Sequence, residues 1–188
     1  AEGVYTVKLV KDGQEYVGKV TLVGDPMLAH SAKDRALQQQ TVMKLYGMLE
    51  RLAYVAEAVR ELRDQVADRV ERGKGDAALV ADLDALNKRL DAFYATLAAT
   101  REGRITGEEQ LREKLGELYG GVSGFAGRPT PSQLARLTTL DAEVDRANRT
   151  FDTFVTVDAK RINERLAEKG LAPLAPLSRE EFDRRSAR

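Results

Sequence analysis

The sequence predicts a mainly α-helical fold: an antiparallel bundle of long amphipathic helices preceded by a β-hairpin. Ala, Glu, Lys, Leu and Arg make up half of the 188 residues, a composition typical of long helices and coiled-coil-like bundles. Beyond residue 31, apolar residues recur three and four positions apart, which is the period of a helix with one buried face. Before residue 24, two β-rich runs flank an Asp-Gly pair, which indicates a hairpin.

The hairpin is predicted over residues 1–24, with strands at 4–10 and 15–23. Asp12-Gly13 suits a two-residue type I′ turn, because both central residues of that turn need positive φ. This turn sets the register and places an apolar set on one face of the ribbon. The set comprises Tyr5, Val7, Leu9, Tyr16, Val20 and Leu22, with Gly18 opposite Val7. We therefore expect these six side chains to be buried.

Something must cover that face, because a lone two-stranded hairpin is at best marginally stable in water. The few residues between the hairpin and the first helix offer no third strand. Either the helices cover the face, so that the hairpin caps the bundle, or a sheet outside this sequence does. The second reading is favoured, since a Gly-x-Tyr-x-Val strand, a turn and a strand resemble the end of many immunoglobulin-like sandwiches. The hairpin would then be the last strands of a truncated β-sandwich.

The helical bundle is predicted over residues 31–168. Ser31 and Asp34 form a capping box for a first helix that ends near Arg72; at 1.5 Å per residue it is roughly 60 Å long. Its apolar stripe comprises Leu45, Met48, Leu52, Val55, Val59, Leu62 and Val66. Gly73–Gly75 ends this helix and Asp76 caps the next, whose stripe is Leu79, Leu83, Leu86, Leu90, Phe93 and Leu97.

The second helix breaks at 102–107, and Thr106 with Glu109 is expected to start a third. Leu111, Leu115, Leu118 and Val122 keep the heptad phase of the second helix across this break. That continuity indicates a three-layer bundle with one kinked arm, although a four-helix up-and-down bundle remains the alternative.

A glycine-rich stretch, Gly120–Arg128, is predicted to be a loop before the last long helix. Thr130 supplies an N-cap, Pro131 the first helical position and Gln133 the N3 residue. The apolar positions that follow are Leu137, Leu140, Val144, Ala147, Phe151, Phe154, Ile162 and Leu166. Residues 169–188 form a C-terminal extension, in which Ser178, Glu181 and Phe182 indicate a short helix.

Composition argues against several classes of function. Lys and Arg total 30, as do Asp and Glu, so the chain lacks the basic excess that phosphate backbones demand. The absence of cysteine removes disulfides, thiolate nucleophiles and Cys-ligated metals. No apolar run approaches the ~20 residues of a membrane span. We expect no nucleic-acid partner and no membrane span.

The candidate reactive residues carry no catalytic pattern. His30 is the single histidine, so no histidine-based metal set can form, and we expect an exposed junction residue. Most carboxylates fall on polar helix faces beside Lys or Arg. Asp145 is expected at the edge of the apolar stripe, and Asp158 at a core position as a partner for an Arg or within a polar network. The stretch 116–127 lacks the Lys-Ser/Thr of a phosphate loop. We expect no catalytic, cofactor-binding or metal-binding residue, and no cofactor.

Several short pieces together resemble the C-terminal region of bacterial secreted proteins with sortilin-like repeats, often labelled BNR-repeat glycosyl hydrolases. These pieces are Gly3–Val7 with Asp12-Gly13, Asp25-Pro26, Gln38–Gln40, Leu118–Gly120, Pro129-Thr130 and Asn163 through Gly170–Leu174. The resemblance implies a β-propeller, a small sandwich and a helical tail in the parent protein. It also implies an extracellular or periplasmic location. The propeller repeats are absent here, so no functional residue transfers.

The sequence therefore predicts a non-catalytic structural or interaction module, the C-terminal part of a larger exported protein. Its partner would be the rest of its own polypeptide or another protein subunit. The chain opens at Ala1, as expected of a cleaved precursor, an internal fragment or a shortened expressed segment. Two alternatives are an accessory portion of a β-propeller glycoside hydrolase and a helical adaptor that binds another protein.

Overall fold

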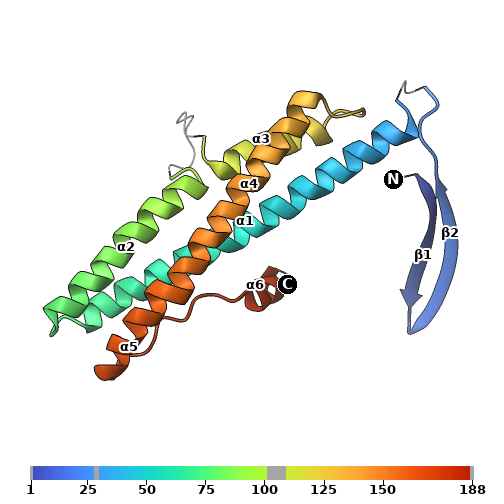
Figure 1. The fold of residues 1–188 in the computed structure, drawn as a ribbon. Helices are drawn as coiled ribbons and strands as arrows, with labels where there is room; N and C mark the ends of the chain where they lie inside the picture. Colours follow the sequence, from blue (N-terminus) through green and yellow to red (C-terminus); the bar gives the residue numbers. More distant parts are fainter. Residues whose placement is uncertain (1, 28–29, 101–108, 187–188) are drawn as a thin grey trace.

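The fold is a bundle of long helices with a β-hairpin attached at one end (Figure 1). A computed structural model of the chain describes residues 2–27, 30–100 and 109–186. The elements in chain order are β1 (Gly3–Lys11), β2 (Gln14–Leu22), α1 (Ala32–Arg72), α2 (Ala77–Leu97), α3 (Leu111–Ser123), α4 (Pro131–Thr153), a π-helical segment η1 (Phe154–Ala159), α5 (Lys160–Glu168) and α6 (Arg179–Ser186). The predicted fold class, mainly α with an N-terminal hairpin, is confirmed.

The bundle has three layers. α1 spans its full length, α2 and α3 follow one another along α1, and α4 continues through η1 into α5 (Figure 1). The segment that joins α2 to α3 includes 101–108, which lie outside the described residues, as does the predicted capping residue Thr106. The N-cap residue of α3 is Gln110, whose backbone N–H donates to the Glu113 carboxylate at 3.2 Å. Of the two topologies expected, the arm formed by α2 and α3 fits the first.

The helix ends follow the predicted signals closely. Ser31 accepts from the Asp34 amide in a capping box, and Asp76 accepts from the amides of Ala78 and Leu79. Thr130 caps α4 through the same box with Gln133. These bonds satisfy amide groups that a helix start otherwise leaves without partners.

Two features of the helices differ from the prediction. α3 continues to Ser123, so Gly116, Gly120 and Gly121 lie in the helix and not in a loop. Leu118 and Val122, one turn apart, are both buried, and this packing outweighs the low helix propensity of glycine. The last long helix also contains a π-helical turn at Phe154–Ala159, which the spacing of its apolar residues did not reveal.

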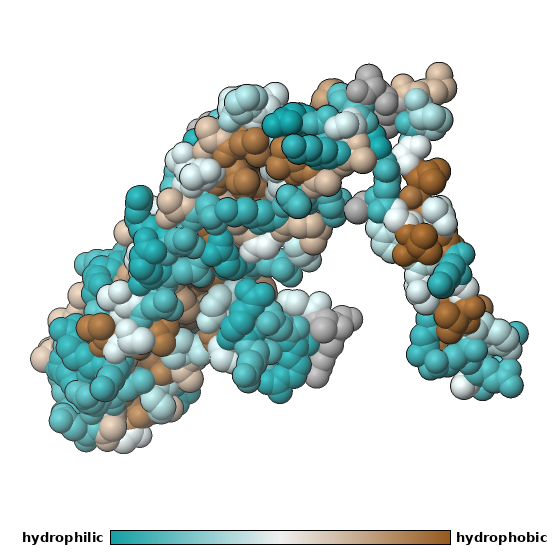
Figure 2. Space-filling view, turned by 45° about the vertical axis from the view of Figure 1, so that its right-hand side comes forward, coloured by the Kyte–Doolittle hydropathy of each residue, from teal (hydrophilic) through white to brown (hydrophobic). Residues whose placement is uncertain are grey.

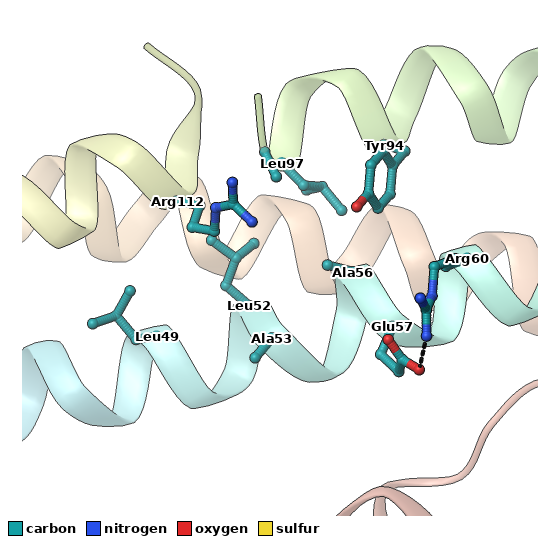
Figure 3. A pocket seen from close by; sticks show the side chains of 10 residues that line it. Leu49, Leu52, Ala53, Ala56, Glu57, Arg60, Tyr94, Leu97 and Arg112 are labelled. Atoms are coloured by element: carbon teal, nitrogen blue, oxygen red, sulfur yellow. Dashed lines mark hydrogen bonds and ion pairs between the residues drawn. The ribbon is translucent and has the colours of Figure 1, made fainter. Parts of the chain in front are cut away.

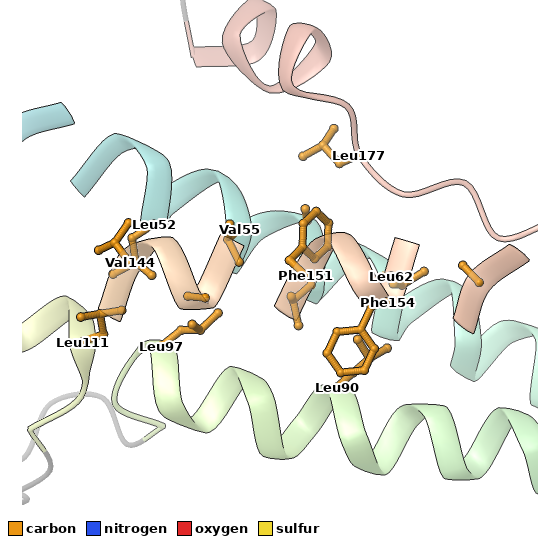
Figure 4. Close-up of a cluster of buried hydrophobic side chains, with 14 of the residues drawn as sticks. Leu52, Val55, Leu62, Leu90, Leu97, Leu111, Val144, Phe151, Phe154 and Leu177 are labelled. Atoms are coloured by element: carbon orange, nitrogen blue, oxygen red, sulfur yellow. The ribbon is translucent and has the colours of Figure 1, made fainter. Parts of the chain in front are cut away.

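The core runs along the seam between the three layers. Apolar side chains from α1, α2, α3 and α4 point toward one another, with Phe151 and Phe154 among them (Figure 4). Seven residues predicted to share the core are all at most 4 % exposed: Leu52, Val59, Leu86, Leu90, Leu115, Phe151 and Phe154. The stripes of the long helices are therefore buried against each other.

The C-terminal extension crosses α1 as a strap over residues 171–177 and ends in α6. Leu174 and Leu177 are buried in the core cluster. The strap backbone is held by side-chain amides: Asn163 bonds both the N–H and the carbonyl of Leu174, at 2.7 and 2.9 Å. Gln65 does the same for Ala175, at 2.7 and 2.9 Å. The strap is thus part of the folded body.

Candidate functional site

The hairpin has the register that the sequence predicts. Asp12 and Gly13 have φ of 51° and 78°, as a type I′ turn requires. Leu9 lies opposite Tyr16, Val7 opposite Gly18 and Tyr5 opposite Val20. The predicted apolar face of the ribbon is therefore present, and we call it the hairpin face: Tyr5, Val7, Leu9, Tyr16, Gly18, Val20 and Leu22.

The predicted burial of this face is wrong for the described chain. Its six side chains are 41–61 % exposed: Tyr5 41 %, Val20 46 %, Leu22 50 %, Val7 51 %, Tyr16 53 % and Leu9 61 %. The hairpin stands apart from the helices as a separate arm, with hydrophobic residues along its length (Figures 1 and 2). The idea that the hairpin caps the bundle is thereby excluded, because no described helix lies over the face.

The opposite face of the ribbon has a different character. It mixes three valines with polar side chains: Val4, Thr6, Lys8, Val10, Glu15, Val17, Lys19 and Thr21. Lys8 and Glu15 form an ion pair at 2.5 Å across this face. One face is thus apolar and the other mixed, which is close to the pattern of an antiparallel sheet with a single covered side.

The base of the hairpin is tied to the start of α1. Arg35 forms an ion pair with Glu2 and also donates to the carbonyl of His30. A cavity of about 620 Å³ lies between the base of the hairpin and the start of α1. Its lining includes Leu22 and Val23 from the hairpin side and Ala32 and Ala36 from α1. The hairpin is therefore held at the end of α1 while its apolar face stays open.

His30 is half-buried and not the exposed junction residue that we expected. Its ring meets Phe125 edge-on at 5.7 Å. In the same region the Gln38 amide donates to the carbonyls of Val122, at 2.8 Å, and Phe125. These contacts connect the start of α1 with the loop after α3, and they give His30 a structural role.

A second cavity lies between α1, α2 and α3 (Figure 3). It measures about 380 Å³ and has an apolar floor that includes Leu52, Ala53 and Ala56. The charged groups at its rim have partners: Arg60 pairs with Glu57 at 2.6 Å, and Arg112 pairs with Glu113 at 2.9 Å. The cavity thus lacks an uncompensated charge that would select a ligand.

The carboxylates whose pKa values the structure shifts have them lowered. Hydrogen bonds from the Leu79 amide and from Lys169 lower the pKa of Asp76 to about 2. The hydroxyl of Ser31 lowers the pKa of Asp34, and Lys44 lowers that of Asp141. A hydrogen bond from Arg72 lowers the pKa of Asp68, and one from Arg185 lowers the pKa of Glu181. A lowered pKa keeps a carboxylate ionised, whereas an acid or base that works near neutral pH needs a raised one.

Asp158 occupies the core position that the sequence predicts and pairs with an arginine. Its carboxylate, 9 % exposed, receives two hydrogen bonds from Arg89 at 2.7 and 2.9 Å. The same guanidinium lies 5.0 Å from the centre of the Phe154 ring. Asp145, 46 % exposed, lies at the edge of the stripe and pairs with Arg51 at 2.7 Å. Both aspartates connect neighbouring helices and have no open space for a substrate beside them in the cavities described above.

Two further findings concern ligands of other kinds. Within residues 2–27, 30–100 and 109–186, no three His, Asp or Glu side chains are grouped as a metal site would require. No helix in the described part of the chain combines the length and apolar character needed to cross a membrane.

Sequence reasoning placed Gly18 opposite Val7 on the hairpin face but assigned no functional meaning to it. The signal was available, because a glycine in the interior of a strand weakens the strand and often marks a site that a ligand or another backbone approaches closely.

Comparison of the chain with protein-family models, curated proteins and solved structures gives no match.

Proposed function

We propose that this chain is a non-catalytic structural or interaction module whose hairpin is its docking element. The partner is the rest of a larger exported polypeptide, or another protein subunit, that covers the hairpin face. The helical bundle serves as a rigid body that holds the hairpin at one end of α1.

One observation carries this proposal: the exposure of the hairpin face. Six apolar side chains, each at least 41 % exposed, lie together on one face of the two strands, around Gly18. Contiguous apolar surface of this kind marks interaction sites, because its burial is favourable. A two-stranded ribbon is also marginal by itself, so docking would stabilise the hairpin as well as join the two bodies.

The helical body supports the same function. The apolar stripes of the long helices are buried in the core. The hairpin face is therefore a better docking surface than any helix face. The ion pair between Arg35 and Glu2 ties the base of the hairpin to the start of α1. The lowered carboxylate pKa values and the paired charges around the 380 Å³ cavity favour a structural role over a catalytic one.

The resemblance to the C-terminal region of sortilin-like repeat proteins adds a setting to this proposal. In that setting the module follows a β-propeller and a sandwich, outside the cell or in the periplasm. The hairpin would join the sandwich, and the helical body would extend from it.

Hydrogen exchange tests the proposal. The amides of β1 and β2 are measured in the purified 188-residue chain and in the protein isolated from the cells that produce it. We expect fast exchange in the purified chain and strong protection in the isolated protein, while α1 and α4 exchange equally in both. Equal exchange of the hairpin in the two samples would contradict a docking role.

A further inference from the structure

Gly18 lies at the centre of the hairpin face, and the fold of the hairpin does not require a glycine there. Its φ is not positive, and a Cβ built at this position would meet nothing within 4 Å. Gly18 pairs in regular register with Val7, so the glycine is not needed to form a bulge. Neither backbone conformation nor lack of space within the chain explains this residue.

A glycine at this place opens a gap in the apolar stripe. On β2 the neighbouring side chains of the same face are Tyr16 and Val20, and across the ribbon lies Val7. These side chains surround a floor of bare backbone. In isolated sheets an aromatic ring often covers such a glycine, but no ring atom comes within 4 Å of the Gly18 Cβ position. The gap is therefore open to a group from outside the described chain.

We propose that Gly18 is the seat for a large apolar side chain from a partner β-sheet, which packs face to face on the hairpin. This inference rests on the proposed docking function and specifies the partner. In face-to-face packing two sheets lie about 10 Å apart and their inner side chains interdigitate. A side chain that inserts over Gly18 fills the gap between Tyr16 and Val20 and fixes the register of the two sheets.

The edges of the ribbon favour a sheet as the partner over a helix. In a two-residue hairpin the alternate residues Val4, Thr6, Lys8 and Val10 direct their backbone groups away from β2. The described residues place no third strand at that edge, nor at the edge of β2. Both nine-residue strands lack proline and bulges, two of the features that protect an edge, and the charged side chains Lys8, Glu15 and Lys19 lie on the opposite face. A partner that is a β-sandwich offers a strand to these edges from one of its sheets and a facing surface to the hairpin face from the other, whereas a helix offers no strand to the edges.

A second copy of the chain is a poorer partner. A second copy would meet the face with its own two-stranded ribbon, which is no wider than the hairpin itself. Two ribbons packed face to face would also leave their edges without strands. A sandwich of two sheets supplies a broad facing sheet and edge strands together.

Photo-crosslinking in the cells that produce the protein tests this inference. Benzoylphenylalanine replaces Leu9, on the hairpin face, or Val17, on the opposite face, and the crosslinked peptide is identified by mass spectrometry. We expect the Leu9 position to crosslink to a β-strand segment that carries a large apolar residue. The Val17 position should give little product.

Two substitutions then distinguish a specific contact over Gly18 from general contact with the hairpin. Gly18→Leu fills the seat and should lower the yield at position 9 by about tenfold or more, because overpacking a tight contact is costly. Lys19→Leu adds the same side chain on the opposite face and should change the yield less than about twofold. Far-UV circular dichroism checks that both variants keep their helices.

Each result has a distinct meaning. An unchanged crosslinking yield with Gly18→Leu would contradict the insertion of a partner side chain over Gly18 and would leave the docking function in place. A crosslink to a helix, or to a second copy of the chain, would overturn the partner sheet. No crosslink from position 9 or from Val20, used as a second position, would overturn the inference and the proposed function together.

Discussion

Asp76 shows how one side chain joins two distant parts of the bundle. Its carboxylate accepts from the amides of Leu79 and Ala78, at 3.0 and 3.1 Å, and pairs with Lys169 at 2.9 Å. It therefore caps α2 and also fixes the end of α5. The cap was evident from the sequence, because Asp76 follows two glycines and precedes an apolar stripe. The lysine was not, since it lies more than ninety positions away.

Removal of this carboxylate should lower stability in a pH-dependent way. Asp76→Ala is expected to lower Tm by about 2–4 °C at neutral pH, as the loss of an N-cap usually does. The folded pKa of about 2 is below the ordinary 3.8, so the contribution is complete above pH 3.8 and is lost as pH falls toward 2. Thermal melts at several pH values should show the difference from wild type shrink in that interval. Asp84→Ala, an exposed change on the same helix, is the control; a constant difference would contradict the assignment.

The pair between Arg89 and Asp158 gives a second prediction at this scale. Arg89→Ala removes both donors from a carboxylate that is 9 % exposed. Loss of hydrogen bonds to a charged, buried group should destabilise the fold by about 1–3 kcal/mol. Lys88→Ala removes the same charge from an exposed neighbour and should have little effect. Chemical denaturation measures both, and equal small losses would show that the pair adds nothing.

At the scale of elements, the heptad pattern predicted the long helices and their buried faces. Leu86 is a typical member, 3 % exposed between α2 and its neighbours. Leu86→Ala should cost about 2–5 kcal/mol, because it removes buried methyl groups and leaves a cavity. A thermal melt of the variant within a degree of wild type would contradict its place in the core.

The strap over α1 makes a separate prediction. Asn163→Ala removes two hydrogen bonds from the backbone of Leu174, so the strap should open more often while the core stays closed. Hydrogen exchange of the Leu174 amide should accelerate by about tenfold or more, since each bond contributes ~1 kcal/mol. Amides in the centre of α4 should be unaffected. The same acceleration throughout the chain would mean that Asn163 stabilises the whole fold and not the strap.

Element boundaries were less predictable than the elements themselves. α3 continues through Gly120 and Gly121 because Leu118 and Val122 are buried on either side of that point. The π-helical turn at Phe154–Ala159 was not expected either; within it Asp158 pairs with Arg89, where the sequence indicated an arginine partner but not which arginine. Propensity and spacing describe a helix in isolation, and these two departures arise from its neighbours.

At the scale of the whole molecule, the sequence predicted the hairpin, its register and the need for a cover. It favoured a cover from elsewhere over one from the bundle but could not establish the choice, because that choice depends on how the residues after Leu22 direct the chain. In the structure, Arg35 and Glu2 hold the hairpin beside the start of α1, and its apolar face remains exposed. The described helices bury their apolar stripes against one another, so the proposed docking surface belongs to the hairpin.

Cysteine accessibility is the most direct test of this account, because the chain has no cysteine of its own. Val7→Cys places a thiol on the hairpin face, and Lys19→Cys places one on the opposite face. Maleimide labelling is measured in the purified chain and in the protein as its cells produce it. We predict fast labelling of both thiols in the purified chain, and protection of Val7→Cys by about tenfold or more in the cellular protein, with Lys19→Cys unchanged. Equal labelling of Val7→Cys in the two samples would contradict the claim that a partner covers this face.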